Sequence, residues 1–111
     1  MINVRVCEKN DSIVLIEIKG HAEFAEYGKD IVCAGVSSII GGLNALDHPE
    51  RFDIKINNGY VFLEKMQTIS KHDRVVIETM VTQLETIKDS YKDYISIRKE
   101  KLKWKEKLFN Y

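Results

Sequence analysis

The sequence predicts an α+β fold, a two-layer sandwich of about five mostly antiparallel strands with two helices on one face, in the order β-β-α-β-β-α-β. Two kinds of periodicity support it. Five short segments alternate apolar and polar residues, as half-buried strands do. Two longer segments repeat apolar residues every three or four positions, as helices with one buried face do. Residues 1–111 are expected to form a single domain.

The first two predicted strands span residues 2–8 and 13–19 and flank a polar turn, as in a hairpin. Their inward-facing residues are expected to be Ile2, Val4, Val6, Val14, Ile16 and Ile18. The opposite face of the predicted sheet carries charged residues such as Arg5 and Glu17. We therefore expect that face to be solvated, and we assign no role to Cys7, which falls on it.

The first predicted helix runs from Ile31 to about Leu46, with Asp30 as its N-cap. Its apolar stripe consists of Val32, Val36, Ile39, Leu43 and Leu46. Glycines within a helix cost roughly 1 kcal/mol each relative to alanine. Gly41 and Gly42 therefore predict a close approach of this helix to the sheet or to a second subunit.

The second half of the chain repeats the pattern. Strands are predicted over residues 52–57 and 60–66, joined by a tight turn at Asn58 and Gly59. Ser70 is expected to cap a helix over residues 71–89, and a fifth strand is expected over residues 94–98. The basic tail, residues 98–107, is interpreted as an edge strand guarded by lysines rather than as a patch for ribosomal RNA.

Composition excludes several classes of protein. The 17 basic and 17 acidic residues cancel, which argues against direct nucleic-acid binding by the body of the protein. No apolar run approaches the ~20 residues that span a bilayer, and no signal-peptide pattern opens the chain. We therefore expect a cytoplasmic protein without membrane association. Cys7 and Cys33 form no Cys-x-x-Cys pair and, with the histidines, no recognised zinc-ligand spacing, so no metal is expected.

The stretch between residues 20 and 38 carries the candidate chemistry. Cys33 falls in the first turn of the predicted helix, where backbone N–H groups and the helix dipole favour a thiolate. His21, just after the second strand, could exchange a proton with it near neutral pH. The N–H groups around Cys33 are candidate oxyanion donors. A buried structural cysteine and an ordinary loop histidine remain the alternative interpretation.

Other residues of this stretch have open roles. Asp30 is either a structural cap or a group turned towards His21, since a carboxylate beside the thiol opposes its negative charge. Ser37 could support the thiol or simply provide a small packing surface. Phe24, Tyr27 and Gly28 lie in the loop before the helix and are candidates for a substrate lid, although Phe24 could equally pack on the core.

The same residues resemble a known family. The pattern comprises Gly20, His21, Ala22, Gly28, Asp30, Val32, Cys33, Ala34, Val36 and Ser37. Its spacing resembles that of the ribosomal-processing cysteine protease family, Prp, and the likeness extends over nearly the whole chain. The resemblance implies that Cys33 is the nucleophile and His21 the general base, with Asp30 and Ser37 in the same signature and Gly28 allowing the lid to move.

The resemblance also implies a substrate and an assembly. Family members remove a short N-terminal extension from the precursor of a large-subunit ribosomal protein, cutting after aromatic residues, and are described as cytoplasmic homodimers without a cofactor. In two competing hypotheses Cys33 takes no part in peptide cleavage. One is a ribosome-associated binding module that uses the basic tail around Trp104, and the other is a thiol-based redox sensor.

Overall fold

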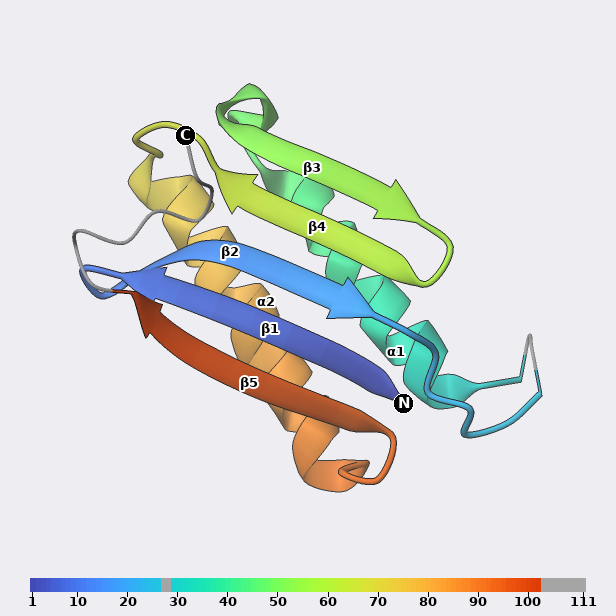
Figure 1. Cartoon of the computed structure of the whole chain (residues 1–111). Helices are drawn as coiled ribbons and strands as arrows, with labels where there is room; N and C mark the ends of the chain where they lie inside the picture. Colours follow the sequence, from blue (N-terminus) through green and yellow to red (C-terminus); the bar gives the residue numbers. More distant parts are fainter. Residues whose placement is uncertain (27–28, 103–111) are drawn as a thin grey trace.

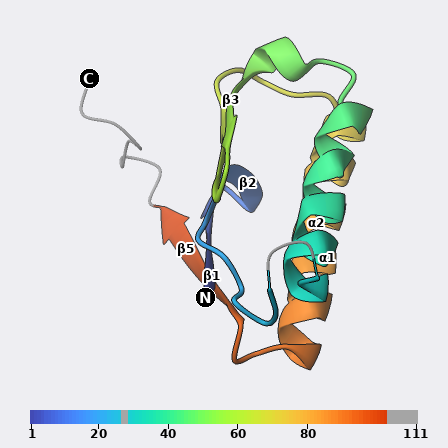
Figure 2. The same cartoon turned by 90° about the vertical axis from the view of Figure 1, so that its right-hand side faces the viewer.

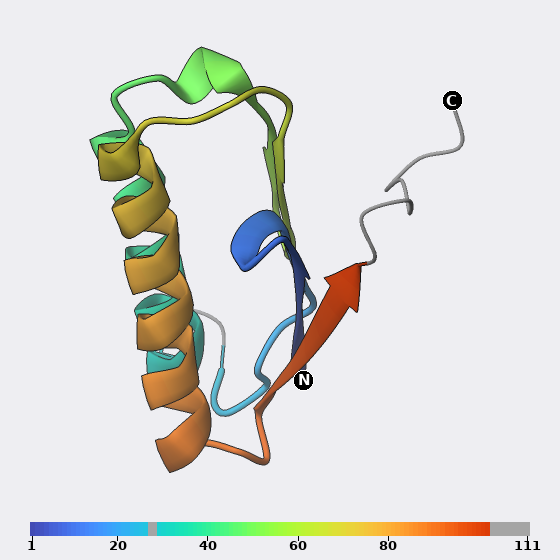
Figure 3. The ribbon, with the colours of Figure 1, turned by 90° about the vertical axis from the view of Figure 1, so that its left-hand side faces the viewer.

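The computed structural model describes residues 1–26 and 29–102 and confirms the predicted α+β architecture. Five strands form one sheet, and two α-helices lie side by side on one of its faces (Figure 1). The strands are β1 (Ile2–Lys9), β2 (Ser12–Lys19), β3 (Phe52–Asn57), β4 (Tyr60–Lys65) and β5 (Ile95–Leu102), and the α-helices are α1 (Ile31–Ile40) and α2 (Lys71–Ser90). Figures 2 and 3 show both helices on the same side of the sheet.

The sheet has the order β3-β4-β2-β1-β5. Three neighbouring pairs are antiparallel, and only β1 and β5, the first and last strands, run parallel. A parallel pair needs a long crossover, which α2 provides by returning the chain along the helical face before β5 begins. β3 and β5 are therefore the two edges of the sheet.

The main core fills the space between the sheet and the helices. As predicted, the alternating residues of β1 and the stripes of α1 and α2 are buried in it. Its members are Ile2, Val4, Val6, Ile16, Ile18, Ala22, Val32, Val36, Leu43, Leu46, Phe52, Val61, Leu63, Ile77, Met80, Val81, Leu84 and Ile95. Among the described residues, no helix combines the length and the apolar character needed to cross a membrane.

The first helix is shorter than the sequence predicts. α1 ends at Ile40, and Gly41–Ala45 form a 3₁₀-helix in place of the expected α-helical turn. Two consecutive glycines weaken the α-helix at this point, and the tighter 3₁₀ geometry is common at helix ends. The predicted apolar residues Leu43 and Leu46 nevertheless remain buried.

The close approach predicted from the glycines is made to α2, not to the sheet. A Cβ atom on Gly42 would lie 3.1 Å from Cγ of Met80, and one on Gly35 would lie 3.0 Å from Cδ1 of Ile87. A Cβ on Gly41 would meet no heavy atom within 4 Å. Only some of the small residues of this helix are therefore required by packing.

The outer face of the sheet is less polar than expected. Cys7, Leu15 and Phe62 form a second buried cluster there, and the Cys7 thiol donates to Oε2 of Glu100. A β-bulge explains part of the difference. Cys7 pairs with Leu15 and Glu8 pairs with Ile13, so Val14 is an extra residue in β2 and packs on the outer cluster, not on the main core as predicted.

The tail interpretation holds for the part that the structure describes. β5 extends to Leu102, four residues beyond the predicted strand, and forms an edge of the sheet that carries Arg98, Lys99 and Lys101. Lys99 forms an ion pair with Glu85 of α2. Residues 103–107, including Trp104, lie outside the described residues.

The start of α2 is connected to the end of the 3₁₀-helix by a buried carboxylate. The Ser70 hydroxyl accepts from the Asp73 N–H, as predicted for a cap. The Asp73 carboxylate, with no exposed surface, accepts from the N–H groups of Asp47 and His48, at 2.8 and 3.0 Å. Burial alone raises the pKa of Asp73, but these two hydrogen bonds and the nearby imidazoles outweigh it and lower the pKa.

Asp73→Ala should therefore destabilise the fold by about 1.5–3 kcal/mol, because two backbone N–H groups lose a buried, charged acceptor. A lowered folded pKa contributes stability above the ordinary pKa of about 3.9 that is lost as the pH falls through the folded value. The difference in unfolding free energy from wild type should thus be constant at neutral pH and shrink below about pH 4. Urea unfolding measures it.

The exposed Asp89, near the end of the same helix, gives the matched control. Asp89→Ala should change the unfolding free energy by less than about 0.5 kcal/mol. Equal losses in the two variants would contradict the structural role of Asp73.

Candidate active site

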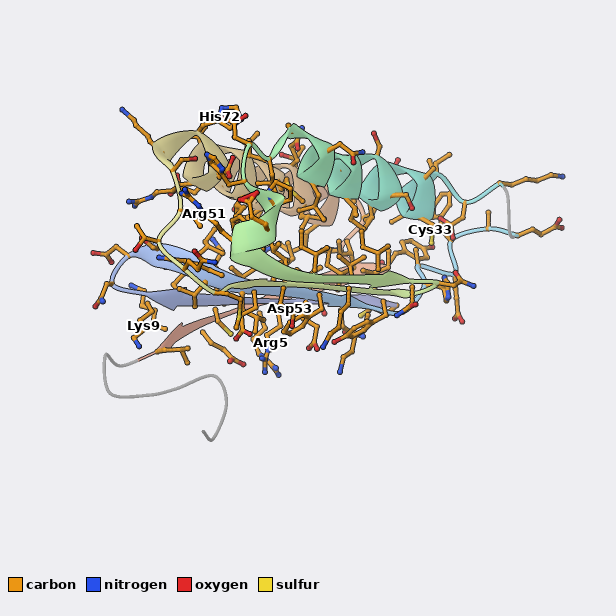
Figure 4. The ribbon with its side chains drawn as sticks, turned by 90° about the horizontal axis from the view of Figure 1, so that it is seen from above. Arg5, Lys9, Cys33, Arg51, Asp53 and His72 are labelled. Atoms are coloured by element: carbon orange, nitrogen blue, oxygen red, sulfur yellow. The ribbon has the colours of Figure 1, made fainter. Side chains whose placement is uncertain are left out.

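The predicted site residues gather at one end of the molecule, where β2 ends and α1 begins. Gly20 and His21 follow β2, and Cys33 lies in the first turn of α1 after the intervening loop. Figure 4 shows Cys33 between α1 and the sheet, at the end opposite His72. The hairpin formed by β3 and β4 reaches the same end and adds its turn to the site (Figure 1).

Cys33 and His21 both line a cavity of about 810 Å³. Its apolar wall comes from the sheet and from α1 and includes Ile2, Ile18, Val36, Ile40, Ile56 and Val61. Its polar lining includes Asp30, Ser37, Glu23 and the three residues Asn57, Asn58 and Tyr60 around the β3–β4 turn. A thiol and an imidazole, twelve positions apart in the sequence, thus face one space that is large enough for a peptide side chain.

The thiol is held by the residue that follows His21. The backbone N–H of Ala22 donates to Sγ of Cys33 at 3.3 Å, and Ala22 itself is buried in the core. A donated hydrogen bond favours the thiolate over the thiol. The contact also fixes the start of the loop against the helix, which keeps His21 and Cys33 at the same place. No pattern in the sequence predicts this hydrogen bond between Ala22 and Cys33.

Asp30 is a structural cap, which decides between the two roles left open by the sequence. Its Oδ1 accepts from the N–H groups of Val32 and Cys33, both at 3.0 Å. Its Oδ2 accepts from the N–H groups of Phe24 and Ala25, at 2.9 and 3.4 Å. Burial raises the pKa of this carboxyl, but the four hydrogen bonds outweigh it and lower the pKa.

This cap corrects the expectation about oxyanion donors. The N–H groups of Val32 and Cys33 are already donated to Asp30. The Ala34 N–H is also in use, because it donates to the Asp30 carbonyl as the first helical bond. These three backbone donors are therefore not free to bind an oxyanion in this conformation.

Gly59 is a site residue that the sequence analysis identified only as a turn residue. A Cβ atom on Gly59 would lie 2.8 Å from Nε2 of His21, so the imidazole packs directly on the glycine backbone. Gly59 has φ of +73°, which other residues adopt only with strain. Its carbonyl accepts from the Gly20 N–H at 2.9 Å, and this bond ties the turn to the residue before His21. In the sequence, only the Asn58-Gly59 pair, typical of a tight turn, pointed to this residue.

The loop residues are placed differently from one another. Phe24 makes edge-to-face contacts with Tyr91 and Tyr94, with ring centroids 5.6 and 5.0 Å apart, and it is not part of the cavity lining. In this conformation Phe24 therefore packs against other side chains of the protein and does not cover the cavity. Tyr27 and Gly28 lie outside the described residues. Ser37 lines the cavity one helical turn after Cys33.

The structure brings one group of possible metal ligands together away from Cys33. Within residues 1–26 and 29–102, one group of possible ligands is close enough together, namely Asp47, His72 and Asp73, within 4.8 Å. It contains neither cysteine and lies at the start of α2, and the Asp73 carboxylate already binds two backbone N–H groups.

We expect Gly59→Ala to disturb the imidazole of His21, because the added methyl group would overlap the ring. Alkylation of Cys33 by iodoacetamide near neutral pH should slow towards the rate of His21→Ala. The fold should lose about 1–2 kcal/mol because of the positive φ. Gly41→Ala is the matched control, since its methyl group would meet open space. A wild-type alkylation rate in Gly59→Ala would refute the placement of His21 against Gly59.

Asp30→Ala should remove both the helix cap and the anchor of the loop. We expect a loss of about 1–2 kcal/mol in unfolding free energy, the usual cost of deleting such a cap. Amide hydrogen exchange at Phe24 and Ala25 should become faster, because their N–H groups lose their acceptor. Glu26→Ala, an exposed carboxylate of the same loop, should leave both measurements unchanged. Unaltered exchange at Phe24 in Asp30→Ala would contradict the anchor.

Comparisons with known proteins point to one family. The family model described as cysteine protease Prp matches residues 1–96. The ribosomal processing cysteine protease Prp of Bacillus subtilis is 36% identical over 107 residues, covering 87% of this chain and 96% of the relative. The protein of the same name from Mycoplasma genitalium is 37% identical over 83 residues, covering 74% and 84%.

Solved structures give the same answer. The essential ribosomal processing protease Prp from S. aureus, in complex with a covalently linked product peptide, superimposes with a TM-score of 0.82 at 29% identity. The alignment covers 90% of this chain and all of that one. Its complex with a substrate peptide gives a TM-score of 0.76 at 28% identity. Sequence, fold and family model therefore agree that this chain belongs to the Prp family of cysteine proteases.

Proposed function

We propose that Cys33 and His21 are the catalytic pair of this cysteine protease. The observation that carries the proposal is that both side chains line one cavity, with Sγ of Cys33 accepting the N–H of the residue after His21. The sequence separation of Cys33 and His21 did not by itself predict that they share a cavity, because the loop between them has to fold back on the helix. Ser37, in the same lining, is proposed to support the thiol, and Asp30 to hold the helix start in place.

The proposed reaction has two halves. The Cys33 thiolate attacks the carbonyl carbon of the scissile bond, and the protonated His21 imidazole gives its proton to the leaving amine. The products of this half are a thioester on Cys33 and the released C-terminal fragment. His21 then takes a proton from water, the hydroxide attacks the thioester, and the carboxylic acid leaves as the Cys33 thiolate and the protonated His21 are restored. One water molecule is consumed for each peptide bond cleaved.

The oxyanion of each half needs donors that Asp30 does not hold. The N–H of Ala22 is of the right kind and lies 3.3 Å from Sγ. Once the Cys33 sulfur has attacked the substrate carbonyl, the negative charge lies on the substrate oxygen bound beside it. The Ala22 N–H would then donate to the substrate oxygen instead of to Sγ of Cys33.

The proposed substrate is the precursor of a large-subunit ribosomal protein, from which this chain removes a short N-terminal extension. The names of the relatives support this, since they are ribosomal processing proteases and the S. aureus enzyme has been solved with substrate and product peptides. The apolar wall of the cavity, with Ile18, Val36 and Ile56 among its residues, suits the aromatic side chain before the cleaved bond.

The loop between His21 and Asp30 is proposed to act as the lid over a bound peptide. Phe24, Tyr27 and Gly28 would be its moving residues, and closure would exchange the ring contacts of Phe24 with Tyr91 and Tyr94 for contacts with substrate. Glu23 has φ of +57°, which marks a sharp backbone reversal just after His21. The Asp30 hydrogen bonds to residues 24 and 25 would then have to lengthen or re-form.

The remaining properties follow the family. We propose that residues 1–111 act as a single domain in a cytoplasmic homodimer, without a metal or an organic cofactor. Sedimentation at a mass near 12.9 kDa, the monomer mass, would contradict the dimer.

The decisive experiment is cleavage of a peptide that spans the extension of the host's ribosomal protein. Wild type should cleave it, Cys33→Ala should show no cleavage, and His21→Ala should be slower by about 10²–10⁴, the usual range for loss of a general base. Cys7→Ala is the matched control and should cleave at the wild-type rate. Burial raises the pKa of the Cys7 thiol, with Glu100 adding to the shift, so this thiol stays protonated. Full activity of Cys33→Ala would overturn the assignment.

A further inference from the structure

One edge of the sheet opens beside the thiol. β3 is the outermost strand on its side, and within the described residues it pairs only with β4. The register between the two strands is regular from Phe52 to Asn57, without a bulge. Its outer backbone groups therefore form a straight row that could pair with another strand.

The hydrogen-bonding phase of β3 follows from a bond at its start. The Met66 N–H donates to the Arg51 carbonyl at 3.0 Å, one residue before the strand begins. In an antiparallel pair, successive residues point their N–H and C=O groups alternately towards the partner and away from it. The backbone N–H and C=O groups of residues 53, 55 and 57 therefore point towards β4. Those of Ile54 and Ile56 point outwards at the open edge.

The end of this edge belongs to the catalytic cavity. Ile56, Asn57 and Asn58 line the same space as Cys33, with Ser37 and Ile40 of α1 on the opposite wall. Figure 4 looks down on this edge, and β3 runs towards the end of the molecule where Cys33 lies. The Ile56 side chain is 58% exposed, an unusual position for an isoleucine on a regular strand.

The two edges of the sheet are protected differently. β5 carries three basic residues, Arg98, Lys99 and Lys101, against one acidic residue, Glu100, which pairs with Arg98, so it keeps the excess of positive charge that holds other strands away from an edge. On β3 the charges are Asp53 and Lys55, which form an ion pair with each other at 3.7 Å, so the strand presents no net charge. The edge beside the thiol is thus the less protected of the two.

We propose that the substrate peptide binds by strand addition to β3, with hydrogen bonds to the main chain of Ile54 and Ile56, before its scissile bond reaches Cys33. Such pairing holds the extended backbone whatever its sequence, while alternate side chains of the peptide point into the cavity. The proposal deepens the proposed function, on which it rests, by naming the surface that holds the peptide backbone.

Amide hydrogen exchange tests the proposal directly, with Cys33→Ala as the protein and the ribosomal-precursor peptide as the probe. Peptide binding should slow exchange at Ile54 and Ile56, whose N–H groups face outwards, and leave Ser96 and Arg98 of β5 unchanged. A peptide that binds without slowing exchange at Ile54 and Ile56 overturns the proposal, and so does a peptide that does not bind. Protection without peptide that grows with protein concentration would assign the edge to a second copy and also overturn it.

Kinetics give an independent readout. Ile56→Pro removes one outward N–H from an edge position that tolerates proline, and Ile56→Ala removes the side chain but keeps the N–H. Relative to Ile56→Ala, Ile56→Pro should lower kcat/KM about three- to ten-fold, chiefly through KM, as expected for one lost hydrogen bond. Equal kcat/KM values in the two variants would refute the pairing.

Two measurements separate this proposal from the proposed function. The rate of Cys33 alkylation by iodoacetamide reports whether the thiol site stays intact in each Ile56 variant, because so small a reagent needs no strand pairing. Cleavage by wild type decides the protease assignment by itself. Cleavage with no protection of β3 would refute strand addition alone, whereas protection of β3 without cleavage by wild type would refute the protease assignment alone.

Discussion

The four hydrogen bonds of the Asp30 carboxylate stabilise the end of this protein that carries Cys33 and His21. Two come from the first turn of α1 and two from the loop that carries Phe24, so a single side chain joins the helix that bears Cys33 to the loop that follows His21. The charge of the carboxylate matters, because backbone N–H groups bind an anion more strongly than a neutral acceptor. Both the place of the thiol and the path of the loop depend on it.

The position of the Asp30 carboxylate is also unfavourable for a negative charge on the Cys33 sulfur. A carboxylate near the thiol opposes the thiolate and also occupies the N–H groups that would otherwise stabilise it. The Ala22 N–H provides a donor from the other side, and it comes from the residue next to His21. The reactive groups are therefore organised by the end of β2 and the β3–β4 turn as much as by the helix dipole.

Much of this could be predicted from the sequence, because periodicity and caps are local. The five strands, both helices, the Ser70 and Asp30 caps and the candidate pair Cys33 and His21 all follow from nearby residues. The missed features depend on contacts between distant segments. Gly59 supports His21 from 38 positions away, the bulge at Val14 reverses a face of β2, and Asp73 accepts from residues far before it in the chain.

The pairing of the first strand with the last has a consequence for how the enzyme matures. The residues that line the cavity with the thiol all lie before residue 62, yet β1 keeps an open edge until β5, which ends at Leu102, arrives beside it. A growing chain on the ribosome therefore contains all the reactive groups before it contains the sheet that fixes them.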